Sequence, residues 1–199
     1  MKSILNLFVM LTLVFSFTTF AQQSKKQDKK QDKKSDVKKV RVSPKAGVFQ
    51  TIGITDVNVS YSRPGVKNRK IWGELVPYNK VWRAGADEAT KITFSTDVMI
   101  EGKKLPAGAY GFFAIPGENE WTLIFNKIAD QWGAFTYNES EDALRIKVKP
   151  VANSNHEWLL YSFTDMTPPA APTSAYLNLI WEKLKVPFKI EGKGDVAAK

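Results

Sequence analysis

Residues 183–190 read Lys-Leu-Lys-Val-Pro-Phe-Lys-Ile, an alternation of apolar and other side chains in which proline takes one of the outward positions. A period of two places the apolar residues on one face of a β-strand and leaves the other face to solvent. Because Pro187 has no N–H to donate to a neighbouring strand, we expect this strand to lie at a sheet edge or to contain a bulge there.

Strand patterns recur along the chain. Three further segments alternate in the same way: residues 56–61, 91–95 and 144–149. Three others are more continuously apolar, as in strands buried on both faces: residues 110–115, 121–125 and 158–163. Proline and glycine turns such as Arg63-Pro64-Gly65-Val66 separate the segments. The one segment that resembles a helical turn is Ile71-Trp72-Gly73-Glu74-Leu75, before Pro77.

These patterns predict an all-β protein: an antiparallel β-sandwich, jelly-roll-like, with one short helical turn. Two packed sheets need aromatic side chains between them, and the chain supplies 12 Phe and 6 Trp. We expect the sandwich to span residues 42–192 and a flexible C-terminal tail to follow at residues 193–199.

The amino terminus has the parts of a secretory signal peptide. Lys2 precedes an apolar stretch at residues 4–20, and the small residues Thr19 and Ala21 suit cleavage after residue 21. The most apolar part, residues 5–17, is shorter than the roughly 20 residues that span a bilayer. We therefore predict a signal peptide at residues 1–21, export to the periplasm or the exterior, and no transmembrane segment in the mature protein.

Residues 22–41 predict a disordered basic linker. They hold nine Lys and Arg against three Asp, in a four-residue repeat that contains no apolar residue from 24 to 36. A helix would stack like charges at i and i+4 along this repeat. The linker serves either as a spacer or as an arm that touches anionic envelope surfaces.

Outside that linker the charge is nearly balanced. One cation lies in residues 1–21 and nine lie in 22–41, which leaves 19 of the 29 Lys and Arg for the rest, against 17 of the 20 Asp and Glu. The net charge of +9 belongs mainly to the linker, so we expect no nucleic-acid partner. The absence of cysteine excludes disulfides and thiolate sites, and a single histidine, His156, excludes a two-histidine metal site. We expect neither a metal nor a cofactor.

The loop-rich stretch at residues 61–90 concentrates arginine, aromatic and acidic side chains, and loops on a rigid sheet are common binding sites. Guanidinium groups match carboxylate, sulfate or phosphate, aromatic rings stack on a sugar or a flat ligand, and carboxylates orient the arginines. The predicted ligand-binding residues are Arg63, Arg69, Tyr78, Trp82, Arg83, Asp87 and Glu88.

Three functions remain open. The first is non-catalytic binding of a small anionic or carbohydrate-like ligand or an envelope component, with no catalytic residue. The second is a hydrolase acting on a glycan or ester with Asp87 or Glu88 as general base, although adjacent strand residues point to opposite faces. The third is a structural module in which Arg83 pairs with one of these acids and braces the loop. Residues 132–137 are either an aromatic strand beside the site or part of the core.

Several segments, in order along the chain, together resemble a family of uncharacterised proteins. They include Val59-Ser60-Tyr61-Ser62-Arg63-Pro64, Arg69-Lys70-Ile71-Trp72-Gly73, Trp82-Arg83-Ala84-Gly85-Ala86 and Leu105-Pro106-Ala107-Gly108-Ala109-Tyr110. The family is "domain of unknown function 2911", found largely in exported proteins of Bacteroidetes-type bacteria, and the resemblance covers residues 43–190. It implies export and one β-rich domain, but no reaction. The family's pattern has asparagine where this chain has Asp87.

Overall fold

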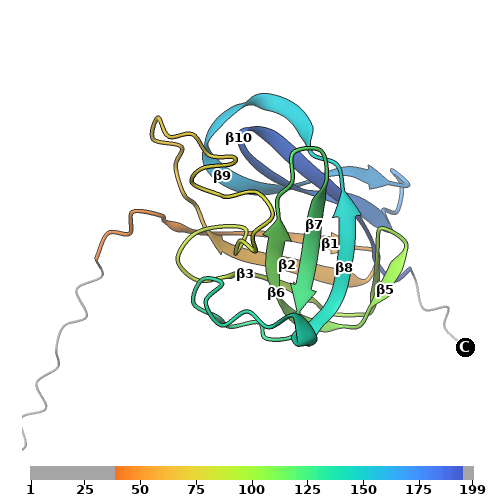
Figure 1. The fold of residues 1–199 in the computed structure, drawn as a ribbon. Coiled ribbons are helices and arrows are strands. Elements are labelled where there is room, and N and C mark those ends of the chain that lie inside the picture. Colours follow the sequence, from red (N-terminus) through yellow and green to blue (C-terminus); the bar gives the residue numbers. More distant parts are fainter. Residues whose placement is uncertain (1–38, 195–199) are drawn as a thin grey trace, which may run out of the picture. The chain divides into compact units, whose positions relative to one another are not determined.

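The computed structural model describes residues 39–194, in which antiparallel strands form two sheets (Figure 1). The larger sheet has the order β1-β2-β3-β6-β7-β8 and the smaller has the order β5-β4-β10-β9. The strands are β1 (Lys45–Ile52), β2 (Thr55–Ser62), β3 (Thr90–Phe94), β4 (Val98–Ile100), β5 (Lys103–Leu105), β6 (Gly108–Ile115), β7 (Trp121–Asn126), β8 (Asp142–Val148), β9 (Val151–Thr167) and β10 (Ser174–Glu191). The predicted signal peptide and residues 22–38 of the predicted linker lie outside the described residues.

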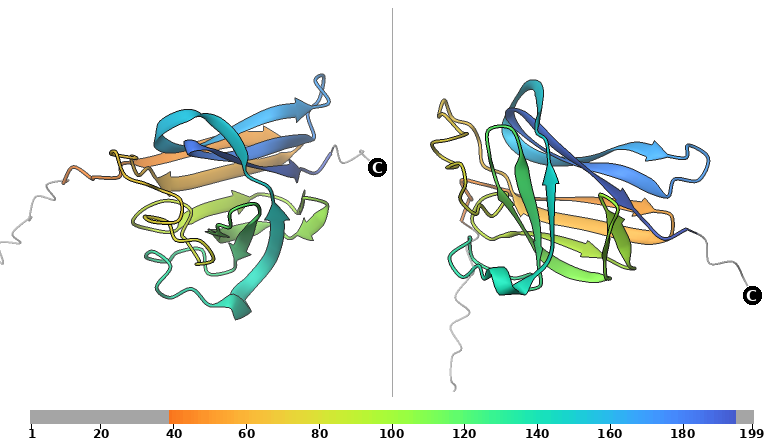
Figure 2. Two further views of the ribbon diagram at one scale, coloured as in Figure 1. Left: turned by 45° about the horizontal axis from the view of Figure 1, so that its top comes forward. Right: turned by 45° about the vertical axis from the view of Figure 1, so that its right-hand side comes forward.

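The predicted all-β antiparallel sandwich is confirmed. Each segment with a strand pattern lies in a strand to within one residue, because alternation is imposed by the backbone itself. Figure 2 shows the long β9–β10 hairpin lying across the larger sheet. Within residues 39–194 the only helix is a three-residue 3-10 turn, which is too short to cross a membrane.

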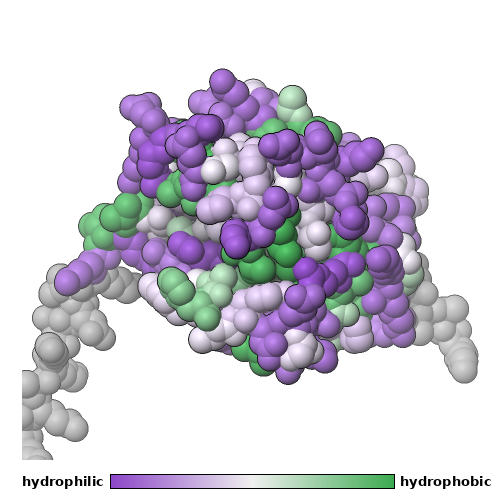
Figure 3. Space-filling model, in the orientation of Figure 1, coloured by the Kyte–Doolittle hydropathy of each residue, from purple (hydrophilic) through white to green (hydrophobic). Residues whose placement is uncertain are grey.

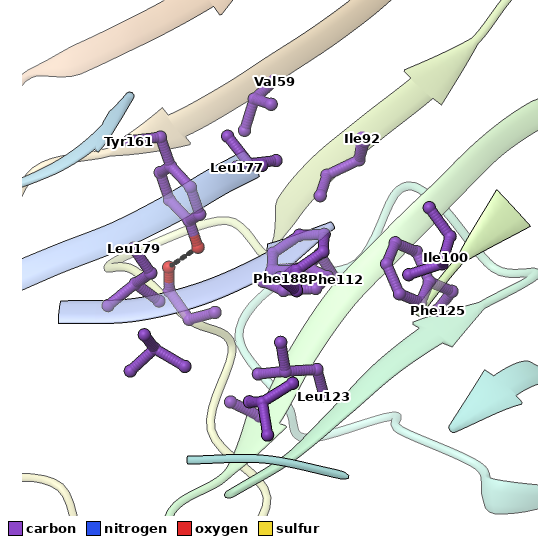
Figure 4. Close-up of a cluster of buried hydrophobic side chains, with 14 of the residues drawn as sticks. Val59, Ile92, Ile100, Phe112, Leu123, Phe125, Tyr161, Leu177, Leu179 and Phe188 are labelled. Atoms are coloured by element: carbon purple, nitrogen blue, oxygen red, sulfur yellow. Dashed lines mark hydrogen bonds between the residues drawn. The ribbon is translucent and has the colours of Figure 1, made fainter. Parts of the chain in front are cut away.

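Aromatic rings from both sheets fill the space between them (Figure 4). Phe112 of β6 and Phe188 of β10 stack with centroids 5.6 Å apart, and Phe125 of β7 packs against both. In the same core four tryptophans meet edge to face or stacked, with centroids 4.9–6.4 Å apart: Trp72, Trp82, Trp121 and Trp181. Two of the four come from the long loop after β2, so the core itself anchors that loop.

The short helical turn was predicted at the wrong place. It lies at Glu139–Glu141, capped by the Asn138 side chain, which accepts a hydrogen bond from the Ser140 N–H at 3.1 Å. The chain at residues 71–75 makes turns instead, because Gly73 has a φ of +85°, which no right-handed helix allows.

Pro187 lies where its strand has no ladder partner. The pairing of β10 with β9 ends at Lys185, and its pairing with β4 begins at Ile190. Pro187, which has no N–H to donate, therefore lies in the part of β10 between its pairing with β9 and its pairing with β4. The strand itself lies inside its sheet rather than at the edge.

Candidate functional site

The long loop at residues 63–89 is held to the sandwich by backbone pairing at three places. Trp82 exchanges two 2.8 Å hydrogen bonds with Ala114 of β6, and Gly65 forms a bridge with Trp158 of β9. Near its end, the Ala89 N–H donates to the Gln131 carbonyl at 2.9 Å and the Gly133 N–H donates to the Asp87 carbonyl at 3.0 Å. The loop is thus fixed along its length by elements distant in the sequence.

Side-chain donors hold the sharpest part of this loop. The Ala84 carbonyl accepts from the Tyr161 hydroxyl at 2.8 Å and from Thr90 Oγ1 at 2.9 Å. Burial raises the pKa of Tyr161 well above its ordinary value, so its hydroxyl stays protonated and donates. Ala84 has a φ of +50°, an uncommon conformation for a residue with a side chain, and these bonds compensate for it.

Asp87 and Glu88, near the end of the loop, bind the same arginine, which is Arg41 rather than Arg83. Arg41 donates from Nη2 to Asp87 Oδ2 at 2.9 Å, from Nη1 to Glu88 Oε1 at 3.0 Å, and from Nη2 to Glu88 Oε2 at 2.5 Å. Lys45 Nζ adds a 3.1 Å contact to Glu88 Oε1. Arg41 is the last residue of the predicted linker, so the chain is already docked on the sandwich there. We call these four residues the Arg41 cluster.

Adjacent acids reach the same guanidinium because the backbone turns between them. Asp87 has a φ of +56°, so the alternation of a strand does not apply and both carboxylates face one side. Aspartate and asparagine adopt this left-handed conformation more readily than most residues.

Arg41 lowers the pKa of Glu88 to about 2, mainly through its hydrogen bonds, with Lys45 adding a smaller contribution. The hydrogen bonds that Arg41 donates to Glu88 and Asp87 raise the pKa of Arg41 in turn. Glu88 is therefore ionised at any pH at which the protein is expected to work. A general base needs a pKa near the operating pH, so this carboxylate is suited to holding cations rather than to taking protons.

The Glu88→Gln variant is expected to lose less stability in acid than the wild type. The folded-state pKa of Glu88 lies below its ordinary 4.5, so its ion pair stabilises the fold above pH 4.5 and is lost as the pH falls toward 2. Because the side chain is 35% exposed, solvent screening reduces this contribution to roughly 1 kcal/mol. Urea unfolding at pH 7 and pH 3 measures the free energy of unfolding of both proteins. An equal decrease between pH 7 and pH 3 in the wild type and in Glu88→Gln would contradict the prediction.

Arg83 lines a cleft of about 230 Å³ between the start of the described chain and the long loop. Lys67, Arg69 and Arg83 line it together with the single carboxylate of Asp87, and Trp82 and Trp181 supply apolar wall. Burial lowers the pKa of Arg83, and the charge of Asp87 opposes this only in part. Within the described residues the buried Nε atom of Arg83 has no hydrogen-bond partner. We call this the Arg83 cleft.

The structure brings four of the seven predicted ligand-binding residues to the Arg83 cleft: Arg69, Trp82, Arg83 and Asp87. Arg69 is held by its own turn, donating to the Gly65 carbonyl at 2.6 Å and the Val66 carbonyl at 3.0 Å. Trp82 is only 9% exposed and its Nε1 donates to the Gly85 carbonyl at 3.1 Å, so it forms wall rather than an open stacking platform.

The other three predicted residues lie apart from the Arg83 cleft. Arg63 donates from Nε to the Leu159 carbonyl of β9 at 2.8 Å and joins loop to sheet. Tyr78 is partly buried, with its ring directly over Gly73. Glu88 lines a second cleft of about 320 Å³, which shares no lining residue with the Arg83 cleft.

The second cleft contains a residue that the sequence analysis did not select, Trp132. Residues 132–137 form no strand, and only part of the segment is core: Ala134 and Tyr137 pack against a buried cluster that contains Phe113, whereas Trp132 is 60% exposed and Phe135 is 84% exposed. Gly133, at a φ of +67°, turns the chain between these two rings. A glycine inside an aromatic run is a signal against a continuous strand and could have pointed to a presented loop. We call this the Trp132 cleft.

Neither cleft offers a metal site. Across residues 39–194 no three His, Asp or Glu side chains gather closely enough to hold a metal ion. The chemistry available is that of guanidinium and ammonium donors, carboxylate acceptors and aromatic rings.

The fold and its clefts define a β-sandwich protein in which loops fixed by the core line small polar clefts. The chain belongs to the family described as "Protein of unknown function (DUF2911)", whose model matches residues 43–190. No curated protein and no solved structure matches the chain.

Proposed function

We propose that this protein is an exported, non-catalytic binding protein whose Arg83 cleft takes a small anionic ligand through a carboxylate, sulfate or phosphate group. The observation that carries the proposal is the Arg83 guanidinium. It is partly buried, its Nε has no hydrogen-bond partner within residues 39–194, and it shares the cleft with two other cations, Lys67 and Arg69, against one acid. The proposed site of action is the periplasm or the exterior, where the basic linker touches anionic envelope surfaces.

The energetics of Arg83 support an anionic ligand. Partial burial of a cation costs free energy unless an opposite charge compensates for it, and the lowered pKa of Arg83 reflects that cost. Asp87 is already hydrogen-bonded to Arg41, so it is a poor counter-ion for Arg83. An oxyanion in the cleft would supply the missing acceptors in the forked geometry that guanidinium groups favour.

The lowered pKa of Glu88 and the hydrogen bonds of both carboxylates to Arg41 favour ligand binding over hydrolysis. Glu88 has a pKa of about 2 because Arg41 donates to both of its oxygens, and Asp87 binds the same guanidinium. A base for hydrolysis of a glycan or ester would need the opposite setting, with a raised pKa and a free oxygen aimed at the substrate.

The test is anion binding by the mature chain, residues 22–199, and by its Arg83→Ala variant. We expect phosphate, sulfate or citrate to raise the melting temperature of the wild type beyond chloride at equal ionic strength. Arg83→Ala is expected to weaken this binding at least tenfold, roughly 1.4 kcal/mol, while its melting temperature without ligand stays close to that of the wild type. Arg83→Lys keeps the positive charge but loses the forked donor geometry of the guanidinium. Its anion affinity should therefore lie between those of the wild type and Arg83→Ala.

The matched control is Arg63→Ala, which removes a guanidinium that bonds β9 outside the cleft. It should keep anion binding even if it lowers stability. Equal anion affinity in wild type and Arg83→Ala would refute the proposal. A large loss of stability in Arg83→Ala without any anion effect would support the structural module instead.

A further inference from the structure

We propose that the Trp132 cleft is a second, separate site that binds a neutral hydroxylated ring, such as one sugar unit of a glycan. The proposal goes beyond the anion site, because the two clefts share no lining residue. It depends on three features: a presented indole ring, a balanced set of charged neighbours, and the size of the cleft.

The indole of Trp132 is exposed on a backbone that cannot readily fold it away. Its side chain is 60% exposed, yet the residues on both sides of it are bonded to the loop at Asp87 and Ala89. The side chain of Gln131 fixes the turn further, donating from Nε2 to the Ile128 carbonyl at 2.7 Å and to Asn126 Oδ1 at 3.2 Å. A large ring held open to water in this way is available to stack against a flat apolar face.

The charges around the ring cancel. Lys45 and Lys91 line the cleft with Glu88 and Asp130, and each lysine is paired with one of these acids: Lys45 Nζ with Glu88 at 3.1 Å, and Lys91 Nζ with Asp130 at 2.8 Å. No net charge is left to attract an ion, in contrast to the Arg83 cleft. Each ammonium has three N–H groups and uses one in its pair, so donors remain for hydroxyl groups.

The hydroxyl of Ser60 and the exposed carboxylate of Asp130 add hydrogen-bond acceptors beside these donors. Paired donors and acceptors next to an aromatic ring match a pyranose, which has hydroxyl groups at its edge and C–H groups on its face. The volume of about 320 Å³ reaches the lower limit of ordinary ligand pockets, roughly 300–1,000 Å³, whereas the Arg83 cleft is smaller. One ring fits the larger cleft, and a single oxyanion group suits the smaller.

The experiment is ligand-observed NMR on the mature chain with cellotriose, maltotriose, triacetylchitotriose and mannotriose, together with the corresponding monosaccharides. We expect saturation transfer from the protein to at least one sugar, strongest at the C–H protons of a single ring. Trp132→Ala should weaken that binding at least tenfold, and Trp132→Phe by less. Equal affinity for monosaccharide and trimer would indicate one ring as the ligand, while tighter trimer binding would indicate a glycan chain.

Phe135→Ala is the matched control, since it removes a still more exposed ring from the same loop that does not line the cleft. It should leave sugar binding unchanged, as should Arg83→Ala, so failure of one site is distinguishable from failure of the other. Absence of binding to every sugar at about 10 mM would overturn the proposal, since even weak specific binding, a dissociation constant near 1 mM, saturates there. Unchanged affinity in Trp132→Ala would overturn it as well.

Discussion

Replacing Phe112 with alanine is expected to lower the free energy of unfolding by about 3–5 kcal/mol. Phe112 is 0% exposed and its ring packs against Phe125, Tyr161 and Phe188, with centroids 5.2–6.2 Å apart. These partners come from both sheets, as Figure 4 shows, so the truncated side chain would leave a void that neither sheet can close alone.

Urea unfolding followed by fluorescence and circular dichroism measures this loss. Phe135→Ala makes the same chemical change at a ring that is 84% exposed, and it should alter stability by no more than about 0.5 kcal/mol. A loss below about 1 kcal/mol in Phe112→Ala would show that the two sheets do not pack through this ring.

Replacing Gly53 with alanine is expected to cost about 2–4 kcal/mol. Gly53 has a φ of +61°, and a Cβ added there would lie 2.1 Å from the Lys193 carbonyl oxygen. Its N–H donates to the Pro172 carbonyl at 2.6 Å, and the next residue donates to the same Lys193 oxygen. The turn between β1 and β2 is thus pressed against the end of β10, with backbone on both sides and no flexible side chain to move away.

Gly102→Ala separates the two causes of this expected loss, which are the strain of the positive φ and the clash of the added Cβ with the Lys193 carbonyl. Gly102 also has a positive φ, +73°, but a Cβ there would meet nothing within 4 Å. It should cost only about 1 kcal/mol, the strain of the left-handed conformation. The same urea titration measures both variants. Comparable losses of stability in Gly53→Ala and Gly102→Ala would contradict the close approach of the β1–β2 turn to the backbone at Lys193.

The face of the molecule drawn in Figure 3 is mixed, with hydrophobic areas scattered among hydrophilic ones. Such a surface suits small, separate sites better than one broad docking face. The Arg83 cleft and the Trp132 cleft, which share no lining residue, fit this description. The Arg41 cluster connects them, because Asp87 lines one cleft and Glu88 lines the other.

The tryptophans show how far the sequence could predict the site. Trp82 and Trp132 both stand in aromatic, loop-rich segments, and only Trp82 was expected to stack on a ligand. Trp82 is instead enclosed by three other tryptophans, while Trp132 is presented to solvent. Which ring is buried depends on what the rest of the chain places over it, and no local pattern encodes that.

The arginines show the same limit. The short sequence distances between Arg63, Arg69 and Arg83 predict one shared binding site. Arg63 instead donates a hydrogen bond to the carbonyl of Leu159, 96 residues away. The partner of Glu88 is Arg41, 47 residues away, in a segment that was assigned to the linker by its charge. An ion pair forms between groups that are close in space, and sequence proximity is a weak guide to that in a β-protein, where most contacts are long-range.

Amino-acid order by itself determined the strands, the class of fold and the turns rich in proline and glycine, because alternation and φ preference are properties of a few neighbouring residues. Tertiary structure alone decided the rest: which arginine meets Asp87 and Glu88, which tryptophan faces water, and where the chain leaves a cleft. These depend on pairings such as Trp82 with Ala114 and Glu88 with Trp132, which exist only once the sheets have closed over the loop. The physical reason is that partner choice follows distance in space and exclusion of water, and both are set by the whole fold.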